Sequence, residues 1–266
     1  MLFNDVAEFQ RMPRFDPTLA DAYRALPEVI AGAVFDGAIL DEARLGPPMK
    51  LLLHMVKGLA VRGLERDAML ALLASESPDA DNGIEAGLRA HFEALDLAKA
   101  RVLCVTTEPN NVVMWGNYAE AHAGCVLGFR HIATLSTPLL EARPVAYAED
   151  SAIVGSGVDF LLYGNTEELR TKTLDAVCFT KKLAWSSERE WRAMTWRPKE
   201  QEQYGDYQFY SEELESVTLG ARASQSTEAN VRALVASRYP STALYRMHSL
   251  NGELARHALP VLDGDA

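Results

Sequence analysis

Residues 101–130, RVLCVTTEPNNVVMWGNYAEAHAGCVLGFR, change the character of the chain from helical to mixed. The two ends of this stretch, 101–107 and 124–130, are short and rich in branched apolar side chains, which is typical of β-strands. Between them, 110–124 carries apolar and aromatic side chains at helical spacing and ends at a glycine, which predicts a helix. The succession of strand, helix and strand predicts that a sheet begins near residue 101.

The rest of the chain completes this fold class. Before residue 101, apolar residues recur at helical spacing in four segments: 16–32, 47–64, 65–77 and 81–100. After residue 130, we expect strands at 143–149, 189–196, 215–221, 243–249 and 252–259, and helices at 158–177 and 226–239. The pattern predicts an α+β fold, in which a helical N-terminal part precedes a mixed or antiparallel sheet with flanking helices. We expect a single domain, 1–266, with a mostly helical part at 1–100 and an α/β sheet part carrying the motifs at 101–266.

The net charge of the chain indicates which classes of binding partner are disfavoured. The chain has 26 Lys and Arg against 37 Asp and Glu, a formal net charge of −11. Non-specific nucleic-acid binding requires a basic face, so this class is disfavoured, whereas a small-molecule or nucleotide ligand stays possible. The sequence has neither an 18-residue apolar run nor a signal-peptide pattern, which predicts a cytoplasmic protein that does not enter the membrane. Three cysteines among apolar neighbours are expected to be buried thiols: Cys104, Cys125 and Cys178.

Four short motifs occur along the chain, and their combination and order indicate a family resemblance. They are Phe3-Asn4-Asp5 with Glu8, then Met114-Trp115 with Tyr118-Ala119, His122 and Gly124, then Lys181 with Trp185, Glu188, Glu190 and Arg192, and last Leu219-Gly220. Together they resemble the bacterial Domain of Unknown Function 2971 family, and the resemblance spans most of the chain. It implies a fold in which polar and aromatic residues of distant segments meet at one site.

The N-terminus departs from the family pattern. Val6 stands where the family has proline, and family members carry a further strand and helix before the Phe-Asn-Asp stretch. The resemblance therefore implies that the first strand of the fold is missing, and that an exposed strand edge pairs with a protein partner or a second copy of the chain. Asn4 and Asp5 are expected either to form a turn or to lie beside the ligand site.

The third motif poses the main chemical question. On a strand, Glu188, Glu190 and Arg192 would share one face, and Trp191 would point from the other face toward the core. Neighbouring carboxylates repel each other, so Arg192 and Lys181 are expected to compensate them. Two interpretations remain open: a structural Glu–Arg pairing, or a pair of working carboxylates in a pocket walled by Trp185.

The helix at 110–124 offers a second set of candidates. Trp115, Tyr118 and His122 lie on one helical face, at positions i, i+3 and i+7. They form either a core stripe or an aromatic wall of the site, with the tyrosine hydroxyl and the imidazole as polar groups.

These residues support two hypotheses from different classes. The Glu-x-Glu motif is also similar, more weakly, to the catalytic glutamate motif of ADP-ribosyltransferases, which implies an enzyme that acts on NAD. Glu190 would stabilise the ribose cation, Glu188 would position the acceptor, and an aromatic ring would stack on nicotinamide. The alternative is a non-catalytic ligand-sensing or interaction module in stress or phage defence. A third hypothesis is a metal-dependent phosphodiesterase in which Asp5, Glu188 and Glu190 supply oxygen ligands to the metal ion. Their spacing does not predict a metal site.

Overall fold

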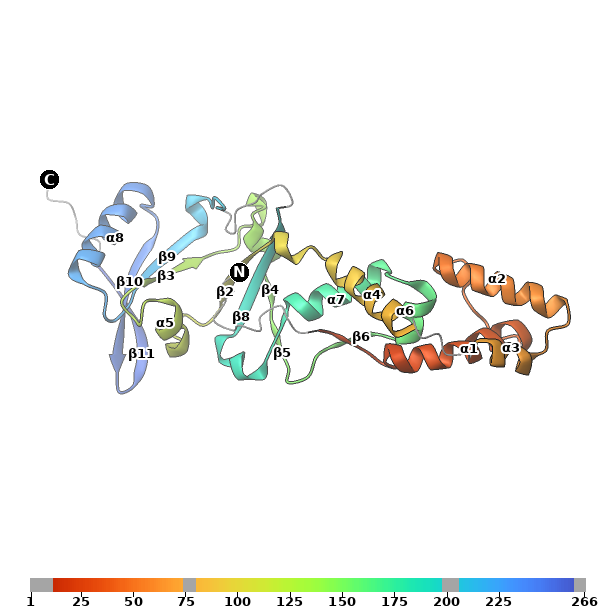
Figure 1. The fold of residues 1–266 in the computed structure, drawn as a ribbon. Coiled ribbons are helices and arrows are strands. Elements are labelled where there is room, and N and C mark those ends of the chain that lie inside the picture. Colours follow the sequence, from red (N-terminus) through yellow and green to blue (C-terminus); the bar gives the residue numbers. More distant parts are fainter. Residues whose placement is uncertain (1–11, 74–79, 198–205, 261–266) are drawn as a thin grey trace. The chain divides into compact units, whose positions relative to one another are not determined.

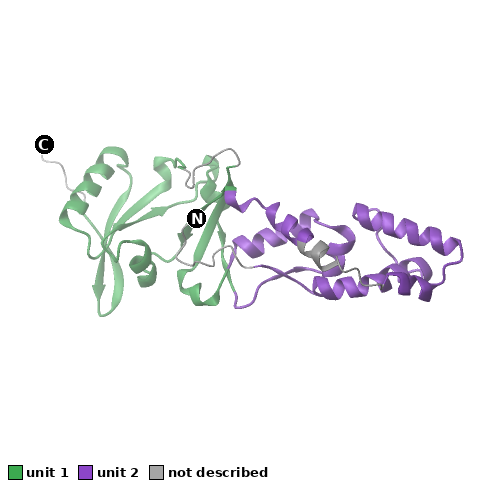
Figure 2. Ribbon diagram, viewed as in Figure 1, with its two compact units in different colours: residues 1, 99–147, 181–266 green, residues 2–98, 148–180 purple. Residues whose placement is uncertain are grey.

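A computed structural model describes residues 12–73, 80–197 and 206–260, with backbone alone at 80–85. The chain divides into two compact units, shown in different colours in Figure 2. The helical unit contains the described residues up to Ala98 together with Ala148–Thr180. The sheet unit contains Lys99–Tyr147 and the described residues from Lys181 onward. Residues 148–180 thus belong with the helices rather than with the predicted sheet part, and the single domain of 1–266 stays a prediction.

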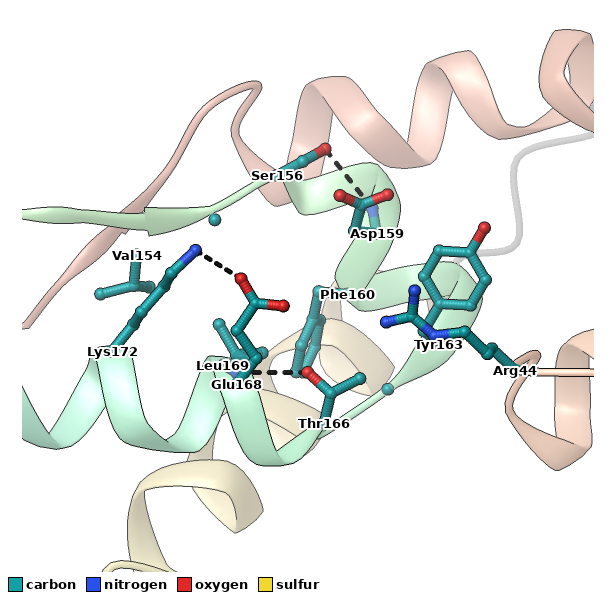
Figure 3. Close-up of a pocket in the computed structure, with 12 residues that line it drawn as sticks. Arg44, Val154, Ser156, Asp159, Phe160, Tyr163, Thr166, Glu168, Leu169 and Lys172 are labelled. Atoms are coloured by element: carbon teal, nitrogen blue, oxygen red, sulfur yellow. Dashed lines mark hydrogen bonds and ion pairs between the residues drawn. The ribbon is translucent and has the colours of Figure 1, made fainter. Parts of the chain in front are cut away.

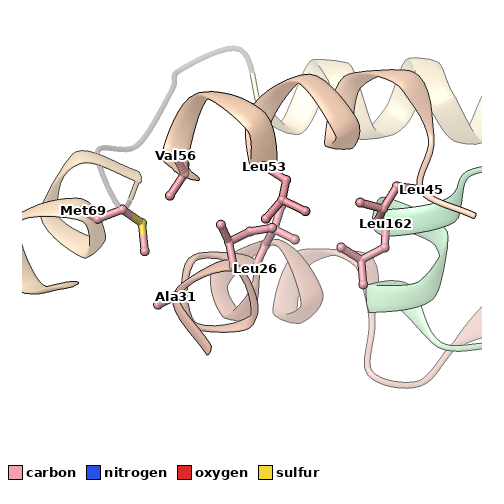
Figure 4. Packing of buried hydrophobic residues seen from close by; sticks show 8 residues of the cluster. Leu26, Ala31, Leu45, Leu53, Val56, Met69 and Leu162 are labelled. Atoms are coloured by element: carbon pink, nitrogen blue, oxygen red, sulfur yellow. The ribbon is translucent and has the colours of Figure 1, made fainter. Parts of the chain in front are cut away.

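The helical unit is built on three helices that share one apolar core. They are α1 (Leu19–Phe35), α2 (Pro47–Val61) and α3 (Arg66–Leu73). Thr18 caps α1 by accepting a hydrogen bond from the Asp21 amide at 3.2 Å. Leu26 and Ile30 are one turn apart on α1, and they meet Leu53 of α2 in the core. Figure 4 shows this cluster, which Met69 of α3 completes.

The remainder of the helical unit surrounds a short strand pair. β1 (Arg14–Phe15) runs parallel to β6 (Ile153–Gly155). The same unit contains the helices α4 (Ala80–Glu93), α6 (Gly157–Tyr163) and α7 (Glu167–Cys178). The predicted helix 158–177 was wrong in one respect, because it is two helices broken at Gly164. That residue has a φ of 72°, in the left-handed region where glycine carries no steric penalty.

The sheet unit contains two main sheets, labelled in Figure 1. One has the order β11-β10-β9-β3 and the other β2-β8-β4, while β5 and β7 form a separate pair. Their bounds are β2 (Ala100–Thr106), β3 (Cys125–Phe129), β4 (Arg143–Pro144), β5 (Ala146–Tyr147), β7 (Thr180–Lys181), β8 (Glu190–Trp196), β9 (Leu214–Leu219), β10 (Ala243–Leu250) and β11 (Glu253–Ala258). β9 and β10 are parallel, and the other pairs of the two main sheets are antiparallel. The predicted α+β class with a mixed sheet is confirmed.

Two α-helices and several 3-10 turns complete this part of the chain. The helices are α5 (Val112–Tyr118) and α8 (Gln225–Arg238), and the turns are η1 (Leu97–Lys99), η2 (Ala133–Leu135), η3 (Pro138–Glu141), η4 (Leu183–Glu188) and η5 (Ser211–Glu213). α8 packs Val235 against Leu214 and Val217 of β9. Within the described residues, no helix has both the length and the apolar character needed to cross a membrane.

Two local predictions are corrected by the structure. The helix predicted at 110–124 ends at Tyr118, because Glu120, Ala121 and His122 all have positive φ, at 51°, 51° and 72°. Of the three cysteines, Cys178 is buried as predicted, whereas Cys104 and Cys125 are exposed.

Candidate functional site

Local backbone geometry brings the two glutamates of the third motif together. Glu188 ends η4, Arg189 adopts the left-handed conformation with a φ of 45°, and Glu190 begins β8. Glu188 therefore lies on a 3-10 turn rather than on the predicted strand. In β8 the buried face carries Glu190 and Arg192, while Trp191 is only half-buried. Trp191 lies on the other face of β8, where Ala193 is buried, so its predicted orientation toward the core stays a prediction.

Four charged side chains form a buried network, which we call the ion cluster: Lys181, Glu188, Glu190 and Arg192. Lys181 Nζ lies 2.7 Å from Glu188 Oε2 and 3.1 Å from Glu190 Oε2. Arg192 donates from Nε to Glu190 Oε1 at 2.7 Å and from Nη2 to Oε2 at 3.1 Å. No member is more than 5% exposed. Two cations and two carboxylates make the cluster formally neutral.

The electrostatics of Glu190 show how the cluster tolerates burial. Burial alone raises the pKa of this carboxyl, but the hydrogen bonds and charge of Arg192 outweigh it, and the pKa is lowered overall. The Cys104 thiol and the Lys181 charge act in the same direction. A buried ion pair is tolerated when hydrogen bonds satisfy its remaining donors and acceptors, and the two-point contact with Arg192 meets this condition.

Two aromatic side chains of the motifs contact the ion cluster. The Tyr118 hydroxyl donates to Glu188 Oε1 at 2.9 Å, while 53% of the residue remains exposed. The Trp185 ring lies over Lys181, with its centroid 4.9 Å from Nζ, and is half-buried. The structure thus brings together six predicted site residues: Tyr118, Lys181, Trp185, Glu188, Glu190 and Arg192.

Trp115 and His122 have a different role from Tyr118. Trp115 is 2% exposed, packs with Ala119 and Met247, and donates its indole N–H to the Pro109 carbonyl at 2.8 Å. The His122 ring stacks on it, with centroids 6.5 Å apart and an interplanar angle of 9°. Trp115 therefore belongs to a core stripe, the first of the two interpretations of this helix, whereas His122 is half-buried and lies beyond the end of α5.

The left-handed turn after α5 explains the Leu219-Gly220 motif. The His122 carbonyl accepts a hydrogen bond from the Arg222 amide at 2.9 Å, which ties the turn to the end of β9. A Cβ added at Gly220 would lie 2.1 Å from that carbonyl oxygen. Only glycine permits this approach, so the second and fourth motifs are parts of one structural junction.

Sequence reasoning missed three residues around the ion cluster. The Tyr147 hydroxyl accepts from the Glu190 amide at 2.8 Å, and burial followed by the nearby Glu190 charge raises the pKa of this tyrosine. Cys104 lies opposite Arg192 in the β2–β8 ladder. The residue as a whole is exposed, but partial desolvation of its thiol, followed by the nearby Glu190 charge, raises the pKa of that group as well. Thr106 donates to the Glu188 carbonyl at 2.9 Å. Only the antiparallel register of β2 and β8 could have identified Cys104 and Thr106, and a single sequence does not specify that register.

Two other predictions concern metals and the N-terminus. Among the residues that the structure describes, no group of three or more His, Cys, Asp or Glu side chains is placed to hold a metal ion. Asn4 and Asp5, together with the predicted contact of the N-terminus with the sheet, lie outside the described residues.

Comparison with known proteins adds to this geometry. No curated protein and no solved structure matches the chain. One family model, described as a protein of unknown function (DUF2971), matches residues 114–193, a segment that contains all six residues of the ion cluster and its aromatic contacts. In this segment the chain is similar to the DUF2971 family, which supports the resemblance seen in its motifs.

Proposed function

We propose that this protein is a non-catalytic binding module, which holds a flat small-molecule or nucleotide ligand against Tyr118 and Trp185. The observation that carries the proposal is the closed state of the ion cluster. Both oxygens of Glu188 and both oxygens of Glu190 accept hydrogen bonds from protein side chains. The carboxylates therefore bind other groups of the protein, and we assign contact with a ligand to the two aromatic rings.

The closed cluster argues against the enzyme hypothesis. An ADP-ribosyltransferase acting on NAD needs a carboxylate that faces the ribose as positive charge develops on it. Glu190 would have to release Arg192, which is 0% exposed, to do so. Leaving a buried guanidinium underpaired costs on the order of 3 kcal/mol, a cost that would be added to the reaction barrier.

The two rings suit a binding role because a member of the ion cluster orders each of them. Glu188 fixes the Tyr118 hydroxyl, and Lys181 fixes Trp185 by contact with the face of its ring. Rings that are already ordered lose little conformational entropy when a ligand arrives. Stacking of a nucleobase on one aromatic side chain contributes about 1–3 kcal/mol, so two such rings suffice for measurable affinity.

Calorimetric titration of the full chain with NAD⁺ and with ADP tests the proposal, alongside chromatographic measurement of released nicotinamide. We expect saturable binding of a nucleotide and no nicotinamide above the protein-free rate. Tyr118→Ala and Trp185→Ala should each weaken binding about tenfold or more. Tyr210→Ala is the matched control, since Tyr210 is also 53% exposed, and should bind as the wild type does.

Two outcomes would contradict the proposal. Nicotinamide release by the wild type that Glu190→Gln abolishes would establish the enzyme hypothesis instead. Binding that Tyr210→Ala weakens as much as Tyr118→Ala would show that the rings beside the ion cluster have no special role.

A further inference from the structure

The contact between α4 and α7 in the helical unit contains a histidine in an apolar setting. Leu88 of α4 packs against a buried core cluster that includes Val154 and Leu169. His91 lies one turn further along the same face of α4 and is 2% exposed. An amphipathic helix normally carries an apolar residue at such a position, so the imidazole is a titratable group buried at the contact.

Hydrogen bonds determine which nitrogen of this imidazole carries the proton. His91 Nε2 lies 2.9 Å from Oγ1 of Thr173, a buried residue of α7. The threonine hydroxyl donates its one hydrogen to the Leu169 carbonyl at 2.7 Å, so it accepts from His91, and Nε2 carries the proton. Nδ1 is also buried and has no hydrogen-bond partner within the described part of the chain. The neutral ring with its proton on Nε2 therefore leaves no N–H without an acceptor.

Protonation would add a second N–H to the ring, at Nδ1. Two aromatic rings lie close to the imidazole, with centroid distances of 5.4 Å to Phe92 and 5.9 Å to Phe160. Burial lowers the pKa of His91, the Asn165 side chain raises it in part, and the positive charge of Arg170 lowers it further. The docked helix therefore favours the uncharged imidazole.

The charged groups on the neighbouring elements do not compensate a proton on His91. On α4, Arg89 and Glu93 are exposed and lie two positions from His91, on other faces of the helix. On α7, Asp175 lies two positions from Thr173 and likewise on a different face. Exposed side chains account for the remaining charges of α6 and of the first turns of α7: Asp159, Glu167, Glu168 and Lys172. The charge that acts on the imidazole is that of Arg170, which has the same sign as a protonated histidine.

We propose that α4 is an acid-sensitive cover of the helical unit, which uncharged His91 holds in place and which is released when this imidazole is protonated. Release would uncover the core cluster that Leu88 packs against and the Phe160 ring that His91 contacts. Figure 3 shows Phe160 and Leu169 of this region, which also line a cavity of about 340 Å³. A fall in pH would thus expose an apolar surface beside this cavity.

The pH window follows from the direction of the pKa shift. A histidine in the unfolded chain titrates near pH 6.5, and docked His91 titrates below this value. The released helix therefore binds the proton more readily than the docked helix does. The docked state is fully favoured above about pH 6.5 and loses stability as the pH falls below it, by up to about tenfold in the docking equilibrium for each pH unit.

Hydrogen exchange of the full chain between about pH 7.5 and pH 5.5 tests the release, with the rates corrected for the intrinsic effect of pH. We expect the protection of the α4 amides to fall several-fold, up to about tenfold, between pH 6.5 and pH 5.5. The amides of α2, which pack in a different core cluster of the same unit, should keep their protection. Constant protection of α4 over this range, or an equal loss in α2, would overturn the inference.

Two variants separate His91 from other titrating groups. His91→Gln keeps an N–H that can donate to Thr173 and does not titrate, so the protection of α4 should become independent of pH. His54→Gln is the matched control, because His54 is exposed and is the other histidine in the segments of the helical unit. It should keep the pH dependence of the wild type. A pH dependence that persists in His91→Gln, or that disappears in His54→Gln, would overturn the inference.

A measurement on the wild type covers the case in which His91→Gln fails to dock α4. NMR titration of the imidazole Cε1–H signals should show that His91 has a pKa below about 6.5, with the loss of α4 protection following its titration. Titration of His91 at or above pH 6.5 would overturn the inference. Neither experiment measures nucleotide binding at Tyr118 and Trp185, so this inference and the proposed function can fail independently.

Discussion

At the scale of single residues, Glu190 illustrates how partners decide the state of a buried group. Burial disfavours the charged carboxylate, whereas the positive charges of Arg192 and Lys181 favour it. The net result is a lowered pKa of Glu190 in the folded protein. The sequence identified all four members of the ion cluster, because they belong to one motif of the family resemblance, in which neighbouring carboxylates require nearby cations. Whether these carboxylates face a ligand or a cation depends on side-chain packing, which the spacing alone does not determine.

The lowered pKa of Glu190 predicts a pH dependence of stability. In the unfolded chain a glutamate titrates near pH 4.3, and in the folded protein Glu190 titrates below this value. Its contribution is therefore fully present above about pH 4.3 and is lost as the pH falls through the folded pKa. We expect the difference in unfolding free energy between wild type and Glu190→Gln to shrink as the pH is lowered from 7 toward 3. Urea denaturation at a series of pH values measures this, and a difference that grows on acidification would contradict the assigned pairing.

At the scale of elements, the sequence predicted the strands and helices well where local pattern decides them. α1, α2, β2, β8 and α8 occur where they were expected, because apolar periodicity is a local signal, although α8 begins one residue before its predicted start and is capped by Ser224. The break of 158–177 at Gly164 and the early end of α5 were missed. Both depend on backbone with positive φ, and at 120–122 it is adopted by residues that rarely adopt it. Tertiary contacts between the turn at 120–122 and the end of β9 stabilise this backbone conformation. A local sequence pattern cannot predict such contacts.

The junction between α5 and β9 makes a prediction for two glycines. Gly220→Ala would place a Cβ 2.1 Å from the His122 carbonyl oxygen, so we expect a loss of stability of about 3 kcal/mol or more. Gly116→Ala is the control, because it lies inside α5 with nothing within 4 Å of the added Cβ. This second change should stabilise the protein by about 0.5–1 kcal/mol. Chemical denaturation of both variants checks the pair, and equal effects would show that the junction is not tightly packed.

At the scale of the whole molecule, the two units have separate apolar cores. Leu53 lies in the core of the helical unit and Leu214 in that of the sheet unit. Truncation of a buried leucine to alanine costs about 2–5 kcal/mol. We expect hydrogen exchange in Leu53→Ala to accelerate in α1 and α2 while β8 and β9 keep their protection, and the opposite in Leu214→Ala. Acceleration of all these elements by either variant would instead establish the single cooperative domain that the sequence predicted.

The role of the ion cluster is the central claim of this account, and the stability of Glu190→Gln tests it most directly. The substitution keeps the shape of the side chain and removes the charge that pairs with Arg192 and Lys181. The cluster is buried, so chemical denaturation at pH 7 should show a loss on the order of 3 kcal/mol. Glu215→Gln, an exposed carboxylate on β9, should change stability by less than about 0.5 kcal/mol. If Glu190→Gln is as stable as the wild type or more stable, the carboxylate is not a structural partner of Arg192, and a working role for Glu190 would replace the one described here.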